Sequence, residues 1–105
     1  MAAIGIDLGS NKSVLAATKR RGIDIVLNGE SNRSTPTLVA YTGTERLIGD
    51  AVKTQVKRNF KNSILYLTRF LGLNATCKEQ LAQEMLFCPQ KLIEFSNNKI
   101  GFEVV

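Results

Sequence analysis

The first 48 residues consist of short apolar segments separated by clusters of turn-forming residues, and this spacing suits strands but leaves no room for a helix of normal length. Residues 3–7 and 13–18 flank a polar cluster at 9–12, which predicts a β-hairpin. Further strands are predicted at residues 23–27, 38–41 and 45–48, with a loop over residues 28–37. The N-terminal part of the chain is therefore predicted to be a sheet.

Helix signals appear only after residue 49. Asp50 is predicted to be the N-cap of a first helix, because a carboxylate there can accept hydrogen bonds from the free N–H groups of the first turn. The polar residues 59–62 interrupt the pattern. A second helix is predicted to begin at Asn62 or Ser63 and to end at Gly72, since apolar residues recur at helical spacing between them.

The last part of the chain is predicted to contain a third helix and a closing hairpin. Thr76 and Glu79 have the spacing of a capping box, and the helix is expected to end before Pro89. Residues 91–95 and 100–105 flank a polar turn and predict the hairpin. Because its apolar strand reaches the last residue, we expect the chain to be a fragment of a longer protein. Together the elements predict an α/β fold with a mixed β-sheet and helices.

The composition excludes several classes of enzyme. The chain has 14 Lys and Arg against 9 Asp and Glu, a net charge of +5, and no His, which excludes Ser-His-Asp catalysis and imidazole-bound zinc. The spacing of Cys77 and Cys88 fits neither a CxxC redox pair nor a zinc knuckle, so both are expected to be reduced. The sequence shows no signal-peptide pattern and no long apolar run, so we expect a cytoplasmic protein with no membrane partner.

A basic run lies between Asp50 and Glu79, where no carboxylate occurs and the cations include Lys53, Lys57, Arg58, Lys61 and Arg69. Such a run is found in nucleic-acid footprints, at the rim of anion sites and on solvated helical faces. No aromatic RNA-binding motif, zinc knuckle or helix-turn-helix pattern accompanies it. We therefore favour the solvated face and expect no nucleic-acid partner, whose affinity would fall steeply with salt.

The motif that carries the most chemistry lies at residues 4–11, where an apolar strand leads to Asp7 and then to a tight turn of small residues. A turn with Gly9 lets successive backbone N–H groups approach phosphate oxygens, while Asp7 can hold Mg²⁺ through water. A strand rather than a helix follows, so the motif is neither a Walker A loop nor a dinucleotide fingerprint. From these residues alone, an ordinary hairpin turn stays open beside the phosphate site.

Three motifs in order resemble the start of a 70-kDa heat-shock chaperone or of its larger 110-kDa relative: residues 6–10 with Ser13, residues 32–36 and residues 45–51. The similarity continues from residue 59 to the closing hairpin and covers essentially the whole chain. It implies an incomplete lobe I of an actin-like (ribonuclease H-like) ATPase domain. By the resemblance, residues 1–36 are strands of the lobe I base subdomain with the first phosphate loop, and residues 37–105 are its smaller upper subdomain.

The resemblance also implies ATP or ADP with Mg²⁺ as cofactors. Asp7 would take the magnesium-side carboxylate role, and the first phosphate loop would consist of Gly9, Ser10, Asn11 and Lys12. One lobe cannot enclose ATP, so we expect the 105 residues alone to be inactive as an ATPase.

Two positions depart from the family pattern. Members usually carry a lysine before the arginine in the segment that corresponds to residues 66–72, where it helps to orient the attacking water; here the position is Thr68. Loss of a preorganised electrostatic group costs about 10²–10³ in rate, so we expect weak hydrolysis in the parent protein. Asn11 and Lys12 also stand where ATP-hydrolysing members often have Thr-Tyr.

The resemblance thus implies an ATP-binding molecular chaperone that assists protein folding in the stress response, with unfolded client proteins and co-chaperones as partners. The alternative is a non-hydrolysing protein-interaction module or a nucleotide exchange co-chaperone for a partner heat-shock chaperone. The two interpretations differ in the role of Asp7, which a pure interaction module does not need.

Overall fold

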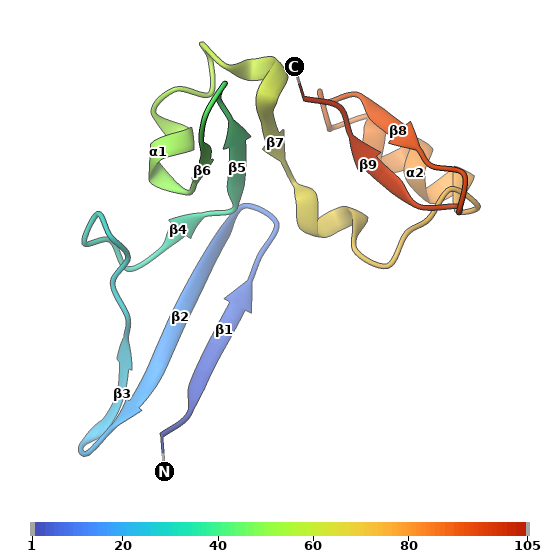
Figure 1. Cartoon of the computed structure of the whole chain (residues 1–105). Coiled ribbons are helices and arrows are strands. Elements are labelled where there is room, and N and C mark those ends of the chain that lie inside the picture. Colours follow the sequence, from blue (N-terminus) through green and yellow to red (C-terminus); the bar gives the residue numbers. More distant parts are fainter. Residues whose placement is uncertain (1, 105) are drawn as a thin grey trace.

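A twisted antiparallel sheet forms the N-terminal part of the computed structural model, which describes residues 2–104 (Figure 1). Strands β1 (Ile4–Leu8), β2 (Lys12–Lys19) and β3 (Gly22–Ile25) lie side by side in that order, and β1 pairs with β2 from Ile4–Ala17 to Leu8–Ser13. The predicted hairpin and third strand are confirmed. A short strand β4 (Thr35–Pro36) pairs with the first residues of β2 and completes this sheet.

The second sheet has β5 (Leu38–Tyr41) between β6 (Arg46–Ile48) and β7 (Ser63–Leu65), all antiparallel. The two strands predicted from residues 38–48 are confirmed, and the helix α1 (Asp50–Lys53) follows them. The N-cap of α1 is Gly49, at φ 62°, and not Asp50 as predicted. Asp50 instead uses its carboxylate to accept side-chain hydrogen bonds from the preceding loop.

The prediction of a second long helix from residue 62 or 63 to Gly72 is wrong. Ser63–Leu65 is strand β7, and only two 3₁₀ turns flank it, η1 (Phe60–Asn62) and η2 (Leu67–Phe70). The residue between β7 and η2, Tyr66, has a left-handed backbone with φ 56°, which no α-helix contains. Pairing of β7 with β5 buries Ile64 in the sheet, and this tertiary contact overrides the helical spacing of the apolar residues.

The C-terminal part is a small unit of its own, in which helix α2 (Lys78–Met85) packs against the hairpin of β8 (Leu92–Glu94) and β9 (Ile100–Phe102) (Figure 1). The third helix and the closing hairpin are confirmed, although Val105 lies outside the described residues. The N-cap is Cys77, so the predicted capping box of Thr76 and Glu79 is wrong; the Thr76 hydroxyl bonds to the Asn74 side chain instead.

The core of this unit contains three buried side chains, Phe70, Leu81 and Cys88, and five partly buried ones around them: Leu73, Met85, Leu92, Ile100 and Phe102. The rings of Phe70 and Phe102 meet edge to face with centroids 4.9 Å apart. Both cysteines are free, as predicted. Burial raises the pKa of the Cys88 thiol, and a hydrogen bond from the Gln90 backbone offsets part of that rise.

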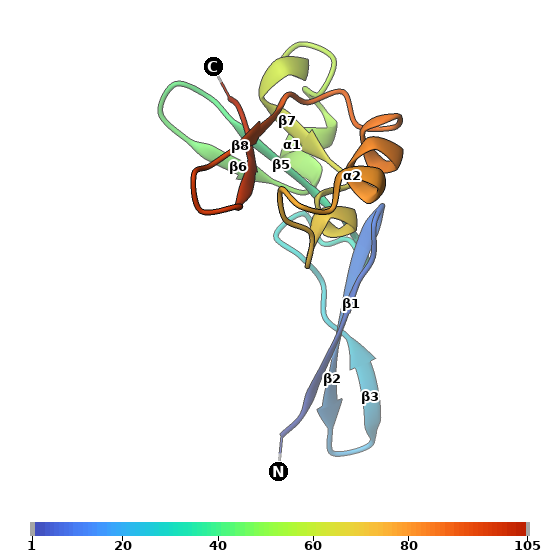
Figure 2. The ribbon, with the colours of Figure 1, turned by 90° about the vertical axis from the view of Figure 1, so that its right-hand side faces the viewer.

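The first sheet extends away from the rest of the molecule with little covering it (Figure 2). The radius of gyration is 16.2 Å, against about 13 Å for a compact chain of this length. The accessible surface is 7997 Å², against about 5,800 Å² for a compact protein of 11.6 kDa. Ile4, Ile6 and Leu8 of β1 are 68%, 65% and 57% exposed, so the apolar side chains of this strand are largely uncovered. No helix within residues 2–104 is long and apolar enough to cross a membrane.

Gly49 is predicted to be required for the junction between the two sheets. Its φ of 62° is rare for L residues, and a Cβ there would lie 2.5 Å from Cγ2 of Thr35. We expect Gly49→Ala to lower the free energy of unfolding by about 1–3 kcal/mol, measured by urea titration. Gly43→Ala is the matched control, because a Cβ at Gly43 meets nothing within 4 Å, and an equal loss in both variants would contradict the prediction.

Phe70 is predicted to hold the C-terminal unit together. Phe70→Ala removes the ring that contacts Phe102 and leaves a cavity in a core of few residues, so we expect a loss of about 3–5 kcal/mol in the free energy of unfolding. Phe87 is 70% exposed, and Phe87→Ala should cost less than about 0.5 kcal/mol. Urea titration of both variants measures these changes. Similar decreases in the free energy of unfolding would contradict the prediction that Phe70 stabilises the core of the C-terminal unit.

Candidate functional site

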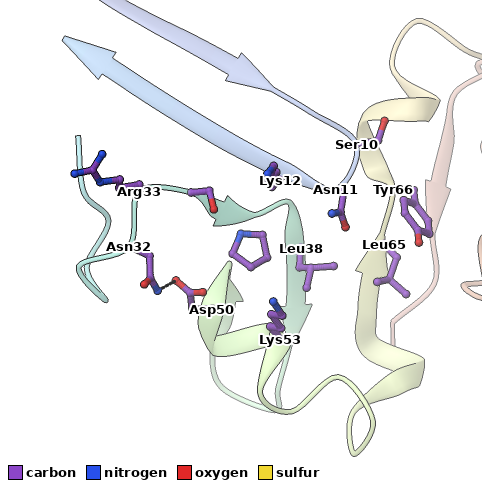
Figure 3. A pocket seen from close by; sticks show the side chains of 12 residues that line it. Ser10, Asn11, Lys12, Asn32, Arg33, Leu38, Asp50, Lys53, Leu65 and Tyr66 are labelled. Carbon is purple, nitrogen blue, oxygen red and sulfur yellow. Dashed lines mark hydrogen bonds between the residues drawn. The ribbon is translucent and has the colours of Figure 1, made fainter. Parts of the chain in front are cut away.

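A cleft of about 450 Å³ lies where the β1–β2 turn meets α1 and the end of β7 (Figure 3). Four segments far apart in the sequence form its walls. The lining residues are Ser10, Asn11, Lys12, Asn32, Arg33, Ser34, Pro36, Leu38, Asp50, Lys53, Leu65 and Tyr66. The cleft therefore contains a hairpin turn rich in backbone donors, cationic side chains and a small apolar floor.

The hairpin turn has a shape that only glycine allows. A Cβ at Gly9 would collide with the carbonyl oxygen of Lys12, so the chain can fold back this closely only without a side chain at that position. The strand ladder ends at the Leu8–Ser13 pair, which leaves the backbone N–H groups of Ser10 and Asn11 outside it. The turn is fixed from the other side by a 2.9 Å hydrogen bond from the Thr37 N–H to the Asn11 carbonyl.

The structure brings Ser10, Asn11 and Lys12 of the predicted phosphate loop together at the cleft, but Asp7 and Gly9 are not among its lining residues. Asp7 lies in β1 opposite Val14, with its side chain exposed. Residues 2–104 contain no group of three or more His, Cys, Asp or Glu side chains that could hold a metal ion. Any Mg²⁺ near this turn would thus need water or phosphate oxygens among its ligands.

The cleft is cationic. Lys12, Arg33 and Lys53 line it, and none of the three forms an ion pair with another described residue. The one carboxylate of the cleft belongs to Asp50, whose Oδ2 accepts hydrogen bonds from the side chains of Asn28 at 2.7 Å and Asn32 at 3.2 Å. Three cationic side chains against one carboxylate leave an excess of positive charge in the cleft.

Sequence patterns predict the turn but miss the opposite wall. In the sequence Lys53 stands out only as one cation of a basic run, and the predicted second helix includes Leu65 and Tyr66. Leu65 and Tyr66 reach the cleft through the antiparallel pairing of β7 with β5, which no local sequence pattern encodes. The basic run itself is the one usable signal, because an anion site is one of its interpretations.

Thr68 lies apart from the cleft, in η2. Its Oγ1 is buried and has no hydrogen-bond partner among the described residues. The next residue, Arg69, forms an ion pair with Glu84 of α2, which ties η2 to that helix. The hydrogen bond from Arg69 to Glu84, and then the charge of Glu84, raise the pKa of the Arg69 guanidinium above its ordinary value.

The known proteins that are similar in sequence to this chain are heat-shock proteins, which is the family that its three motifs resemble. The family model described as "Hsp70 protein" matches residues 3–105. The chain is 45% identical over 100 residues to a heat shock protein homolog of Naumovozyma castellii and 44% identical over 100 residues to a heat shock protein homolog of Saccharomyces cerevisiae, which is 95% of this chain and 14% of each relative.

A second group of relatives carries the 70-kDa name. The chain is 41% identical over 98 residues to "Heat shock 70 kDa protein" of Emericella nidulans, which covers 93% of this chain and 15% of that protein. The chain thus spans about one seventh of the length of these curated relatives. Since the family model matches residues 3–105 and the relatives cover 93–95% of the chain, this chain belongs to the Hsp70 family.

Proposed function

We propose that these residues are part of the nucleotide-binding domain of a heat-shock chaperone and bind the phosphates of ATP or ADP at the β1–β2 turn. The observation that carries the proposal is the turn at Gly9, whose backbone can be approached closely because no Cβ fits there. Ser10 and Asn11 would donate their backbone N–H groups to phosphate oxygens, and Lys12 adds a positive charge beside them. Membership of the Hsp70 family supports the choice of a nucleotide as the ligand.

The residues near this turn can hold Mg²⁺ only with the help of water and phosphate ligands. Asp7 is exposed at the end of β1 and can hold a hydrated Mg²⁺ through water, which suits an ion that keeps several of its waters and takes its other ligands from phosphates. Bound Mg²⁺ would supply charge neutralisation for the phosphate chain. Asp7 would position that ion, and the turn would hold the phosphates against it.

The 105 residues supply only one side of such a site. The excess of accessible surface and the exposure of Ile4, Ile6 and Leu8 support the proposal that further parts of a longer protein cover the first sheet. We place the base subdomain of lobe I at residues 1–36 and the upper subdomain at residues 37–105, and we assign ATP hydrolysis, if any, to the complete domain. The cytosol is the compartment we propose.

The partners we propose are unfolded client proteins and co-chaperones, engaged through the longer protein. The higher identity to the heat shock protein homologs, 45% against 41% for the 70 kDa protein, fits the larger, 110-kDa-type branch of the family. The second candidate function is nucleotide exchange on a partner heat-shock chaperone without hydrolysis. The replacement of the usual lysine by Thr68 favours it, because that site then lacks a charge for the chemical step.

Nucleotide binding is tested in a chimera in which this chain replaces the matched segment of the Saccharomyces cerevisiae relative, so that the rest of the domain is present. We expect calorimetry to show binding of ATP with Mg²⁺, and Gly9→Ala to weaken it about tenfold or more, because the shifted turn loses at least one charge-assisted hydrogen bond. Gly5→Ala is the control, since a Cβ there meets nothing within 4 Å. No binding at millimolar ATP, with the unmodified relative binding normally, would refute the proposal.

The role of Thr68 is tested by restoring a cation in the same chimera. Thr68→Lys breaks no hydrogen bond with any residue in the described part of the chain, and we expect it to raise the single-turnover rate of ATP hydrolysis about tenfold or more. Thr68→Val keeps the shape without the charge and should leave the rate unchanged. If both variants hydrolyse ATP at the rate of the parent chimera, the missing charge is not what limits hydrolysis.

A further inference from the structure

Strand β7 pairs with β5 along one edge, and its other edge faces the C-terminal unit (Figure 1). The Leu38 carbonyl accepts the Gly49 N–H at 3.0 Å, so Leu38 directs its backbone groups toward β6. Its ladder partner Leu65 therefore directs its own N–H and C=O away from β5. Ser63, two residues earlier in the strand, does the same, because the direction alternates along a strand. The outer edge of β7 thus carries backbone groups that need partners.

The side chain of Gln90 binds two of these groups. Its Nε2 donates a hydrogen bond to the Ser63 carbonyl, and its Oε1 accepts the Leu65 N–H at 3.3 Å. A neighbouring strand would bind the same carbonyl and N–H with its own backbone. Gln90 is 3% exposed and Ser63 is 0% exposed, so water has little access to replace these bonds. The amide of Gln90 therefore takes the place of a peptide group at the edge of β7.

The backbone of Gln90 belongs to the C-terminal unit. Gln90 follows α2 and Pro89, and the carbonyl of the next residue, Lys91, accepts the Glu103 N–H at 2.9 Å. The thiol of Cys88, a core residue of this unit, donates a hydrogen bond to Oε1 of Gln90 at 3.0 Å. The Gln90 side chain therefore connects the core of the C-terminal unit to β7.

Leu65 and Tyr66 belong to the wall of the cleft that β7 forms (Figure 3). We propose that Gln90 is a positioning residue for this wall, which it fixes to the C-terminal unit through its two hydrogen bonds with Ser63 and Leu65, the Gln90–β7 contact. A displacement of the C-terminal unit is then transmitted to the cleft, and the unit and the wall open in one event. The inference holds for any ligand of the cleft and does not depend on the proposed function.

The first test removes the amide and keeps the length of the side chain. In Gln90→Met the Ser63 carbonyl and the Leu65 N–H lose their partners, so we expect hydrogen exchange at the Leu65 amide of the 105-residue chain to become about tenfold faster or more. Gln83→Met is the control, because it makes the same substitution at an exposed position of α2 and should leave this rate unchanged. Unchanged exchange at Leu65 in a folded Gln90→Met chain would overturn the proposal.

The second test uses pH to restore the contact within one variant. In Gln90→Glu a protonated carboxyl can donate to the Ser63 carbonyl and accept the Leu65 N–H, whereas an ionised carboxylate cannot donate. Burial and these bonds favour the neutral form, so the pKa of the introduced carboxyl should lie above its ordinary value of about 4.3. The stability from the contact is then present below about pH 4.3 and is lost as the pH rises through the raised pKa. The Cys88 thiol, which contacts Gln90, stays protonated because burial raises its pKa.

We therefore expect the urea midpoint of Gln90→Glu to match that of the unmodified chain at about pH 3.5 and to fall below it at about pH 7. The amide signals of Leu65 and Tyr66 should shift over the same pH range. Gln83→Glu introduces an exposed carboxyl and should show neither change. An equal difference in midpoint at both pH values would mean that Gln90 only fills space, and it would overturn the proposal even if Gln90→Met does not fold.

The last test measures whether the C-terminal unit and the cleft wall open together. With Cys77→Ser, Cys88 is the one thiol left in the sequence, and because it is 6% exposed, its reaction with a thiol reagent requires the unit to open. Adding Gln90→Met should accelerate this reaction by the same factor as hydrogen exchange at Leu65, about tenfold or more. A faster reaction of Cys88 with unchanged exchange at Leu65 would show that the unit opens without the wall, which contradicts the proposal.

Discussion

The arrangement of this molecule depends on a two-residue ladder between the start of β2 and β4, in which Lys12 pairs with Pro36 and Ser13 with Thr35. The hydroxyls of Ser13 and Thr37 add a hydrogen bond of 2.8 Å beside it. This ladder is where the chain leaves the first sheet and enters the second, so its geometry sets the position of α1 relative to the β1–β2 turn. Because Lys12 belongs to both the ladder and the cleft, the same contact that joins the sheets also places a cation opposite Lys53.

The elements that sequence patterns predicted correctly are those held by local contacts. The hairpin of β1 and β2 follows from alternating apolar residues and a Gly-containing turn, and the hairpin of β8 and β9 follows from the same signals. The prediction of a helix at residues 62–72 was wrong because the apolar residues of this segment pack against two different parts of the molecule. Ile64 packs in the second sheet, while Phe70 turns to the core with α2 and β9, and the left-handed Tyr66 separates the two. The helical spacing of apolar residues does not show whether they pack against one neighbouring element or against two.

The candidate site also has one part that the sequence predicts and one part that it does not. The turn at Gly9 and the position of Asp7 could be predicted, because a strand followed by small residues is a local pattern. The opposite wall could not, since Lys53 and Tyr66 reach the cleft through the pairing of β6 and β7 with β5. The amides of Asn28 and Asn32, which donate hydrogen bonds to the Asp50 carboxylate at the cleft, carry no sequence signal for that role. Long-range pairing, rather than residue type, gives these side chains their roles.

Under the proposed function, the positions of charge in this chain would favour binding of phosphates over their hydrolysis. A cation accelerates hydrolysis only where it binds the transition state more strongly than the ground state. Lys12 and Lys53 are long, exposed side chains on the walls of an open cleft, and they can follow a phosphate chain equally well before and during reaction. Thr68 stands where the resemblance implies a lysine close to the reacting phosphate, and its buried hydroxyl, which has no hydrogen-bond partner within residues 2–104, offers no charge. Under the proposed function, cations on the walls of the cleft and a neutral Thr68 would suit a site that holds the phosphates of a nucleotide more than one that cleaves them.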